Sequence, residues 1–248
     1  IGERLLSGGP GNDVLEGGGG SDVLDGGPGA DRMSGGAFTD LVTYEGRSAP
    51  VSLTPDGKAD DGEQGEGDSI ADDVEDLRGG SGDDLLASSA SGNKLDGGPG
   101  TDAVSYASSA LPVRVTLAPS GGKADDGAEN EADDLVAIEH VKGGPFDDVL
   151  VGSPGADVLE GGGGADVLDG GGGAGEMIGG PGTGDRADYS SRSRPVSVTI
   201  GAAADDGERE ERALVDLSIE EIVGGLAGDS LKGSASGDAL SGGPGNDR

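Results

Sequence analysis

The sequence predicts an all-β solenoid built from stacked nine-residue units. Three consecutive copies of one unit carry this prediction, reading GGPFDDVLV, GSPGADVLE and GGGGADVLD between Gly143 and Asp169. Each copy has Gly at position one, Asp at position six and Leu at position eight. A fixed short period of this kind is the signature of a solenoid repeat. A flexible Gly-rich linker has no reason to keep Asp and Leu in phase.

The first six residues of a unit suit a turn, and the last three suit a strand. Gly adopts backbone angles that are closed to other residues, so closely spaced Gly lets carbonyl groups converge in the turn. The Val-Leu tails form short strands with Leu pointing inward. Stacked turns bring one Asp each to a spacing of about 4.8 Å. A cation that accepts many oxygen ligands removes their repulsion, and a carbonyl-rich site favours Ca²⁺ over Mg²⁺.

The composition bounds the class of protein. The chain has 248 residues, 55 Gly, no Cys and a formal net charge of −33, and Leu, Ile, Val and Phe make up under a fifth of it. Composition alone predicts disorder, but the period overrides it, and a chain that folds when metal binds reconciles the two. The acidic excess argues against nucleic acid as a partner. No apolar run approaches roughly 18 residues, so we expect no membrane insertion.

The chain alternates between regular and variant segments. Regular repeats occupy 8–43, 70–105, 134–188 and 215–248, and variant segments occupy 44–69, 106–133 and 189–214. Each variant segment begins with Tyr, reaches Pro six residues later, and continues with an alternating strand and a doubled acid before Gly. Their lengths of 26, 28 and 26 residues are each within one residue of three units. We therefore predict one continuous domain, 1–248, in which the variant segments are irregular coils. The strand pattern predicts inward side chains at Val51, Leu53, Val113, Val115, Val196 and Val198.

Position six supplies the candidate metal ligands. Asn93 should weaken its site, Gly175 removes one carboxylate, and one extra residue places Asp185 a step late. The acids of the variant segments either bind calcium or form solvated loops. Those acids are Asp60, Asp61, Asp125, Asp126, Asp205 and Asp206. The position-six candidates are Asp13, Asp22, Asp31, Asp40, Asp84, Asn93, Asp102, Asp148, Asp157, Asp166, Asp229, Asp238 and Asp247.

These units resemble the RTX (repeats-in-toxin, hemolysin-type) calcium-binding family. The resemblance implies a right-handed parallel β-roll with two units per coil, in which several Ca²⁺ ions bind between units i and i+2. It implies pairing of Asp13 with Asp31, Asp22 with Asp40, Asp84 with Asp102, Asp148 with Asp166, and Asp229 with Asp247. It also implies carbonyl ligands at positions two and four. Those candidates are Gly9, Gly11, Gly18, Gly20, Gly27, Gly29, Gly80, Gly82, Gly144, Gly162 and Gly164.

The resemblance also implies export to a calcium-rich exterior, so we expect a secreted, extracellular or cell-surface protein with a structural or adhesive role. We expect no enzyme, because the single histidine, His140, stands beside Glu139 without a Ser or Cys partner. The alternative is the calcium-binding C-terminal repeat region of a larger exported enzyme or toxin. Neither end carries a polar capping unit, so we expect end-to-end assembly into filaments or a surface layer, unless caps were cut away with a longer protein.

Overall fold

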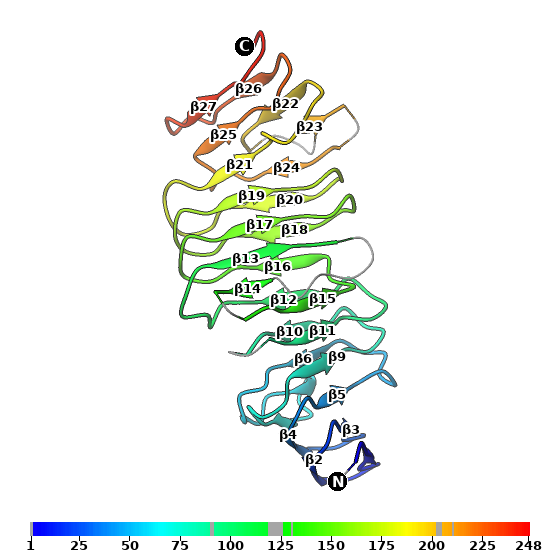
Figure 1. Cartoon of the computed structure of the whole chain (residues 1–248). Coiled ribbons are helices and arrows are strands. Elements are labelled where there is room, and N and C mark those ends of the chain that lie inside the picture. Colours follow the sequence, from blue (N-terminus) through cyan, green and yellow to red (C-terminus); the bar gives the residue numbers. More distant parts are fainter. Residues whose placement is uncertain (1, 90–91, 119–125, 130, 202–204, 210) are drawn as a thin grey trace. The chain divides into compact units, whose positions relative to one another are not determined.

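The structure is a computed structural model that describes residues 2–89, 92–118, 126–129, 131–201, 205–209 and 211–248. The described residues form 27 short strands and no helix (Figure 1). No described segment is a helix that could cross a membrane. The strands form two compact units, Ile1–Ser105 with Ser120–Ile138, and Tyr106–Pro119 with Glu139–Arg248. One continuous domain stays a prediction.

The first unit contains fourteen of the strands. They are β1 (Leu5–Ser7), β2 (Val14–Gly19), β3 (Val23–Asp25), β4 (Arg32–Ala37), β5 (Leu41–Thr43), β6 (Val51–Leu53), β7 (Gly62–Glu63), β8 (Ser69–Ile70), β9 (Asp76–Arg78), β10 (Leu85–Ala87), β11 (Lys94–Asp96), β12 (Ala103–Ser105), β14 (Gly127–Ala128) and β15 (Asp134–Val136).

The second unit contains the other thirteen. They are β13 (Val113–Thr116), β16 (His140–Lys142), β17 (Val149–Val151), β18 (Val158–Glu160), β19 (Val167–Asp169), β20 (Glu176–Ile178), β21 (Arg186–Asp188), β22 (Val196–Thr199), β23 (Gly207–Glu208), β24 (Leu214–Val215), β25 (Glu221–Val223), β26 (Ser230–Lys232) and β27 (Ala239–Ser241).

Strands two nonapeptides apart stack in parallel. Leu6 is in register with Leu24, and Leu150 is in register with Leu168. In the first unit the strand orders are β1-β3-β5-β9-β11-β15, β2-β4-β8 and β12-β10-β6-β7. In the second unit they are β24-β20-β18-β16, β13-β17-β19-β21-β25-β27 and β23-β22-β26. The all-β, parallel-roll prediction is confirmed, with two repeats per coil.

The core is a stack of position-eight side chains. Leu24, Leu86, Leu150 and Leu168 are fully buried, whereas the flanking residues of most three-residue strands are half-buried. Removing each such side chain from water contributes on the order of 1.5–3 kcal/mol. The coils are thin, so each inward residue packs mainly against its own coil and the adjacent ones. The fold therefore depends on the register that the turns set.

The variant segments differ from the predicted irregular coils. Their six predicted inward residues are all buried, as the alternation requires. The first and third segments, however, also form antiparallel hairpins, in which β6 pairs with β7 and β22 pairs with β23. Gly62 and Gly207 adopt φ angles of 90° and 97° where β7 and β23 begin, a left-handed conformation that glycine adopts at little cost. The doubled acid followed by Gly therefore belongs to a hairpin.

Candidate metal centre

The Asp at position six folds back over the Gly at position one of its own unit. A Cβ built on Gly17 would lie 2.8 Å from Oδ2 of Asp22 and 2.4 Å from the carbonyl oxygen of Gly35 in the next coil. The same approach recurs for Gly161 and Asp166. Position one must therefore be Gly wherever the carboxylate takes this orientation, which explains why the two residues recur together.

One oxygen of each paired carboxylate accepts a hydrogen bond from the coil before it. The donor is the main-chain N–H of the position-six residue eighteen residues earlier. Stacked coils are therefore joined by a ladder of carboxylates on main-chain N–H groups. All five expected pairs are adjacent: Asp13 with Asp31 (2.8 Å), Asp22 with Asp40 (2.7 Å), Asp84 with Asp102 (2.8 Å), Asp148 with Asp166 (2.8 Å) and Asp229 with Asp247 (2.9 Å).

The ladders contain acids that the sequence reasoning missed. Glu75 and Glu220 stand at position six of glycine-poor units, which was the available signal. Asp185 joins the ladder despite the extra residue in its unit, and Asp68 and Asp133 come from variant segments. The bonds run from Asp31 to Asp68 (2.8 Å), Asp40 to Glu75 (3.0 Å), Asn93 to Asp133 (2.9 Å), Asp166 to Asp185 (2.9 Å) and Asp185 to Glu220 (3.0 Å).

The turns are of two kinds, which differ in the hydrogen bonding of the second carboxylate oxygen. We call the first kind open turns. In an open turn the position-two Gly is left-handed, as at Gly18 (φ 90°) and Gly162 (φ 99°). Oδ2 of the acid is then buried without a hydrogen-bond partner in the described part of the chain. The acids with such an orphaned oxygen in open turns are Asp13, Asp22, Asp31, Asp40, Asp166 and Asp185.

In the second kind, a closed turn, the position-two N–H donates to the acid or amide of its own unit. Gly144 donates to Oδ2 of Asp148 at 2.6 Å, and neither Gly144 nor Gly80 is left-handed. Ser89 makes the equivalent bond to Oδ1 of Asn93 at 3.1 Å. The closed turns among the described residues are those of Asp84, Asn93, Asp148, Asp157, Asp229 and Asp238.

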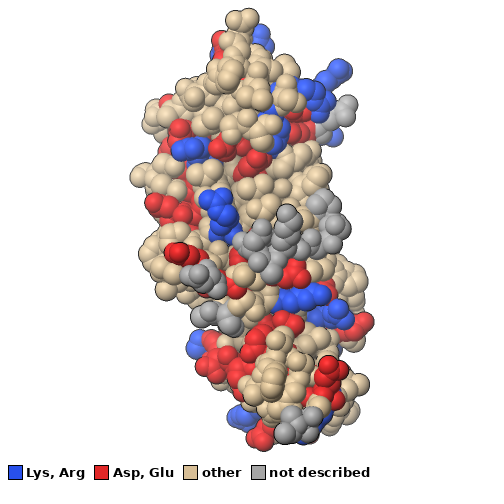
Figure 2. Space-filling view, viewed as in Figure 1, with Lys and Arg blue, Asp and Glu red and all other residues tan. Residues whose placement is uncertain are grey.

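Burial acts against the charge of two carboxylates in open turns, Asp40 and Asp166. Desolvation raises the pKa of Asp40 and raises that of Asp166 to about 7, although a hydrogen bond from the adjacent coil lowers both. Neighbouring carboxylates in the ladder raise both pKa values further. Figure 2 shows that acidic side chains also predominate over basic ones on the face it displays. A cation in the open turns would reverse both effects, because it supplies an opposite charge and a ligand for Oδ2.

Comparison with known families agrees with this geometry. The RTX calcium-binding nonapeptide repeat matches four stretches, residues 7–42, 71–105, 142–177 and 218–248, which together exceed half of the chain. This chain belongs to the RTX calcium-binding repeat family. Its repeats therefore bind multiple calcium ions. No curated protein matches the chain.

The open turns of this RTX chain fit calcium. Each offers a buried carboxylate oxygen that lacks a partner among the described residues, beside a left-handed glycine at position two, such as Gly9. Position four is also left-handed in the turn of Asp13, at Gly11, and in the turn of Asp40, where the residue is Phe38. Hard oxygen ligands of this kind suit Ca²⁺. Asp13 and Asp31, with the carbonyls of Gly9 and Gly11, would hold one ion. Asp22 and Asp40, with Gly18 and Gly20, and Asp166 and Asp185, with Gly162 and Gly164, would hold others.

The remaining carbonyl candidates have distinct surroundings. The carbonyl of Gly27 accepts a hydrogen bond from the guanidinium of Arg47, which also forms ion pairs with Glu66 (2.9 Å) and Glu63 (3.3 Å). An arginine therefore supplies the positive charge at that turn. Gly80, Gly82 and Gly144 lie in closed turns, and Gly29 lies in an open one. Within the described ranges no three acidic or histidine side chains converge on one point, so a bound ion would rely largely on backbone carbonyls.

The doubled acids of the variant segments brace the hairpins. Asp61 accepts main-chain N–H bonds from Thr54 (2.6 Å) and Ile70 (2.9 Å), so both carboxylate oxygens are used. Asp206 accepts the equivalent bonds from Thr199 (2.6 Å) and Val215 (3.1 Å). Asp126 is also buried, whereas Asp60 and Asp205 are exposed. Asp125 lies outside the described residues. The hairpin bonds favour a bracing role over calcium binding for Asp61 and Asp206.

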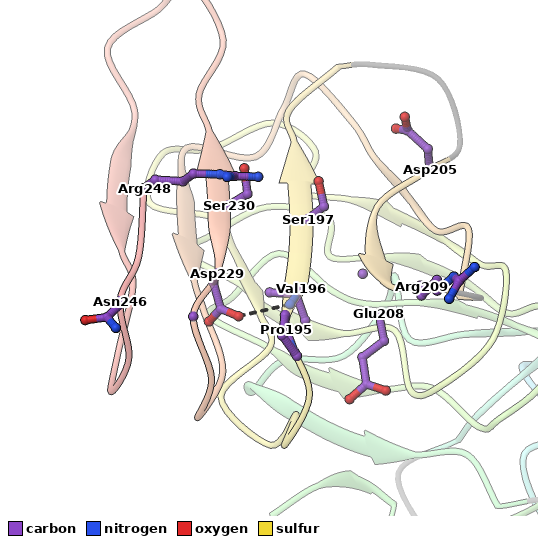
Figure 3. Close-up of a pocket in the computed structure, with 12 residues that line it drawn as sticks. Pro195, Val196, Ser197, Asp205, Glu208, Arg209, Asp229, Ser230, Asn246 and Arg248 are labelled. Atoms are coloured by element: carbon purple, nitrogen blue, oxygen red, sulfur yellow. Dashed lines mark hydrogen bonds between the residues drawn. The ribbon is translucent and has the colours of Figure 1, made fainter.

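A hollow lies beside the closed turn of Asp229 (Figure 3). Glu208, Arg209 and Arg248 line it, and the N–H of Val196 donates to Oδ1 of Asp229 at 2.9 Å beside them.

His140 is not among the residues that line this hollow. It lies on β16 and faces Glu160, with 3.9 Å between Nε2 of His140 and Oε2 of Glu160. Burial lowers the pKa of His140.

Proposed function

We propose that this chain is a structural or adhesive module of an exported protein, that calcium folds it, and that it has no catalytic role. One observation carries the proposal: fully buried carboxylates such as Asp40, Asp166 and Asp185 leave Oδ2 without a partner in the described part of the chain. A buried charge that lacks a partner is strongly destabilising. The described fold is therefore incomplete until a cation occupies the open turns.

The charge of the whole chain supports the same conclusion. A net charge of −33 over 248 residues opposes compaction. Calcium would lower the charge and join stacked turns at once. Its binding energy then becomes folding energy, as in other small metal-dependent folds. A module of this kind would stay unfolded where calcium is scarce and would fold at the calcium-rich exterior.

A calcium titration followed by far-ultraviolet circular dichroism tests this proposal. Calcium should induce a β spectrum, and magnesium at the same concentration should not, because Mg²⁺ sheds its water reluctantly. Asp40→Asn should raise the calcium midpoint severalfold, since Asp40 has a partnerless buried Oδ2 among the described residues. The matched control is Asp60→Asn, because Asp60 is exposed. Equal midpoints for the two variants, or an equal response to magnesium, would contradict the proposal.

Self-association is the second part of the proposal. Strand β27 ends the order β13-β17-β19-β21-β25-β27. Its inward residue Leu240 is 46% exposed, whereas Ile222 of the adjacent β25 is fully buried. A strand edge with an exposed apolar residue is a template for another chain, so a second copy that stacks on β27 would cover Leu240.

Light scattering across a wide concentration range tests self-association. The mass should grow with protein concentration in calcium, and Leu240→Ser should reduce that growth. Leu217→Ser is the control, because Leu217 is 64% exposed and lies between β24 and β25 in the sequence. A monomeric mass at every concentration would refute end-to-end assembly and leave the calcium proposal intact.

A further inference from the structure

The closed turns of Asp84, Asp148, Asp157, Asp229 and Asp238 have the sequence of calcium sites but not the geometry. We infer that calcium enters only the open turns, and that a main-chain N–H takes its place in the closed ones. This inference rests on the calcium-dependent function proposed above. It separates the position-six residues into ligands and hydrogen-bonded braces, a distinction that the repeat sequence alone does not make.

In the closed turns of Asp84 and Asp148, both carboxylate oxygens already accept main-chain hydrogen bonds. In the unit of Asp84, Oδ2 accepts from Gly80 at 2.6 Å and Oδ1 accepts from Val51 at 2.9 Å. Asp148 is held in the same way by Gly144 (2.6 Å) and Val113 (2.8 Å). An N–H that points at Oδ2 occupies the side of the carboxylate that is free in the open turns. A cation could enter only after that peptide rotated and both N–H and oxygen lost their bond.

The residue at position two explains why three of the closed turns resist this rotation. Ser occupies position two in three closed turns, at Ser89, Ser153 and Ser234. The open turns have left-handed residues at position two, including Gly9 and Gly180. A residue with a side chain pays about 1–2 kcal/mol for the left-handed conformation. Ser at position two therefore favours the closed form.

The other three closed turns have Gly at position two but meet a variant segment. A Cβ on Gly80 would lie 2.5 Å from the carbonyl of Arg47, and one on Gly225 would lie 2.6 Å from that of Arg192. The next residue is bonded there as well, because Ser81 donates to the Arg47 carbonyl and Leu226 donates to the Arg192 carbonyl, both at 2.9 Å. The variant segment thus holds the peptide of the adjacent turn in place at Asp84 and Asp229. At Asp148 the contact is looser, since a Cβ on Gly144 would lie 3.1 Å from the carbonyl of Tyr106.

The coil that follows Asp157 gives an independent reason to exclude this residue from the calcium ligands. Its strand, β18, pairs with β20, which pairs with β24. Val158 is in register with Glu176, and Glu176 is in register with Leu214. The residues that correspond to Asp157, each one place before these partners, are therefore Gly175 and Ala213. No carboxylate occupies the corresponding position in the coil that follows Asp157, so an ion between these two coils would lack its second acid.

The count of bound calcium ions, by native mass spectrometry at saturating calcium, tests the inference. Asp185→Asn should lower the count by at least one relative to the parent chain. Asp157→Asn is the matched control from a closed turn and should leave the count unchanged. A count that falls for Asp157→Asn, or that stays constant for Asp185→Asn, would overturn the inference. A parent chain that binds no calcium would instead refute the proposed function.

Hydrogen exchange on the unmodified chain covers the case in which a variant does not fold. In the calcium-loaded protein the amides of Ser153 and Ser234 should exchange slowly, because they remain bonded to Asp157 and Asp238. Calcium entry would require these amides to leave their carboxylates. Free exchange at both residues under saturating calcium would therefore overturn the inference without any substitution.

Discussion

The main-chain N–H of Asp22 donates a 2.7 Å hydrogen bond to Oδ1 of Asp40, one coil further along. This bond uses one oxygen of Asp40 to fix the register of two coils and leaves Oδ2 buried without a partner in the part of the chain that the structure describes. The same carboxylate therefore fixes the register of the coils and, in the function that we propose, would also be a metal ligand. We therefore expect a substitution of Asp40 to affect folding and calcium binding together.

The buried tyrosines should differ in what their hydroxyl groups contribute. Tyr44 donates a 2.6 Å bond to Oδ2 of Asp68, whereas the hydroxyl of Tyr189 is buried with no partner among the described residues. Ala213 explains the difference, because it bridges to Asp206 as Asp68 bridges to Asp61. Tyr44→Phe should cost about 1–3 kcal/mol, since it removes a bond to a charged group.

Tyr189→Phe is the matched control and should be neutral or slightly stabilising. Urea denaturation of both variants at saturating calcium measures the two changes in the free energy of unfolding. Equal losses of stability in the two variants would contradict this prediction, because the hydroxyl bond to Asp68 would then contribute no additional stability.

The two phenylalanines should respond differently to replacement by Gly. Both stand at position four of a unit, but Phe38 has a φ of 85° in an open turn, and Phe146 in a closed turn is not left-handed. Phe38 is also 72% exposed, so its ring contributes little burial. Phe38→Gly should raise stability by about 1 kcal/mol, because it removes the left-handed strain.

Phe146→Gly should give no such gain and should lower stability slightly through lost burial and added chain entropy. Thermal denaturation in calcium compares the two. A Phe38→Gly variant that melts below the parent chain would contradict the assigned backbone conformation.

The calcium-free chain should become more ordered as the pH falls from neutral toward 4. Burial raises the pKa of Asp61 to about 7 and of Asp206 to about 6, from a usual 3.8. A carboxyl with a raised pKa in the folded state favours folding when it is protonated. Its contribution is complete below pH 3.8 and is lost as the pH rises through 6 to 7.

Circular dichroism in chelator from about pH 3 to about pH 8, a range that extends about one unit below the usual pKa of 3.8 and about one unit above the raised pKa of Asp61, measures this dependence. Asp61→Asn should flatten the dependence, because Asn cannot be charged. Asp60→Asn, at the exposed neighbour, should not. A β signal that grows as the pH rises in chelator would reverse the predicted sign.

The repeat predicted most of the fold, since the period of Gly, Asp and Leu indicates the turns, the strands and the core, and the resemblance to the RTX family implied the two-unit coil and the carboxylate pairs. It did not predict the hairpin that Asp61 braces, because two acids before Gly also suit a solvated loop. It missed Asp185, because an extra residue in the turn broke the period while leaving the ladder intact. It also gave no way to separate Asp148 from Asp166, since Gly at position two permits both peptide orientations. Ser153 was a usable signal, because Ser disfavours the left-handed orientation.

Small-angle X-ray scattering with and without calcium at pH 7.5 tests the central claim most directly, that calcium completes this fold. The calcium-loaded chain should be compact, and removal of calcium should move its radius of gyration toward about 55 Å, the value expected for an unfolded chain of this length. Readdition of calcium should restore the compact form. A chain that stays equally compact after complete removal of calcium would contradict the account.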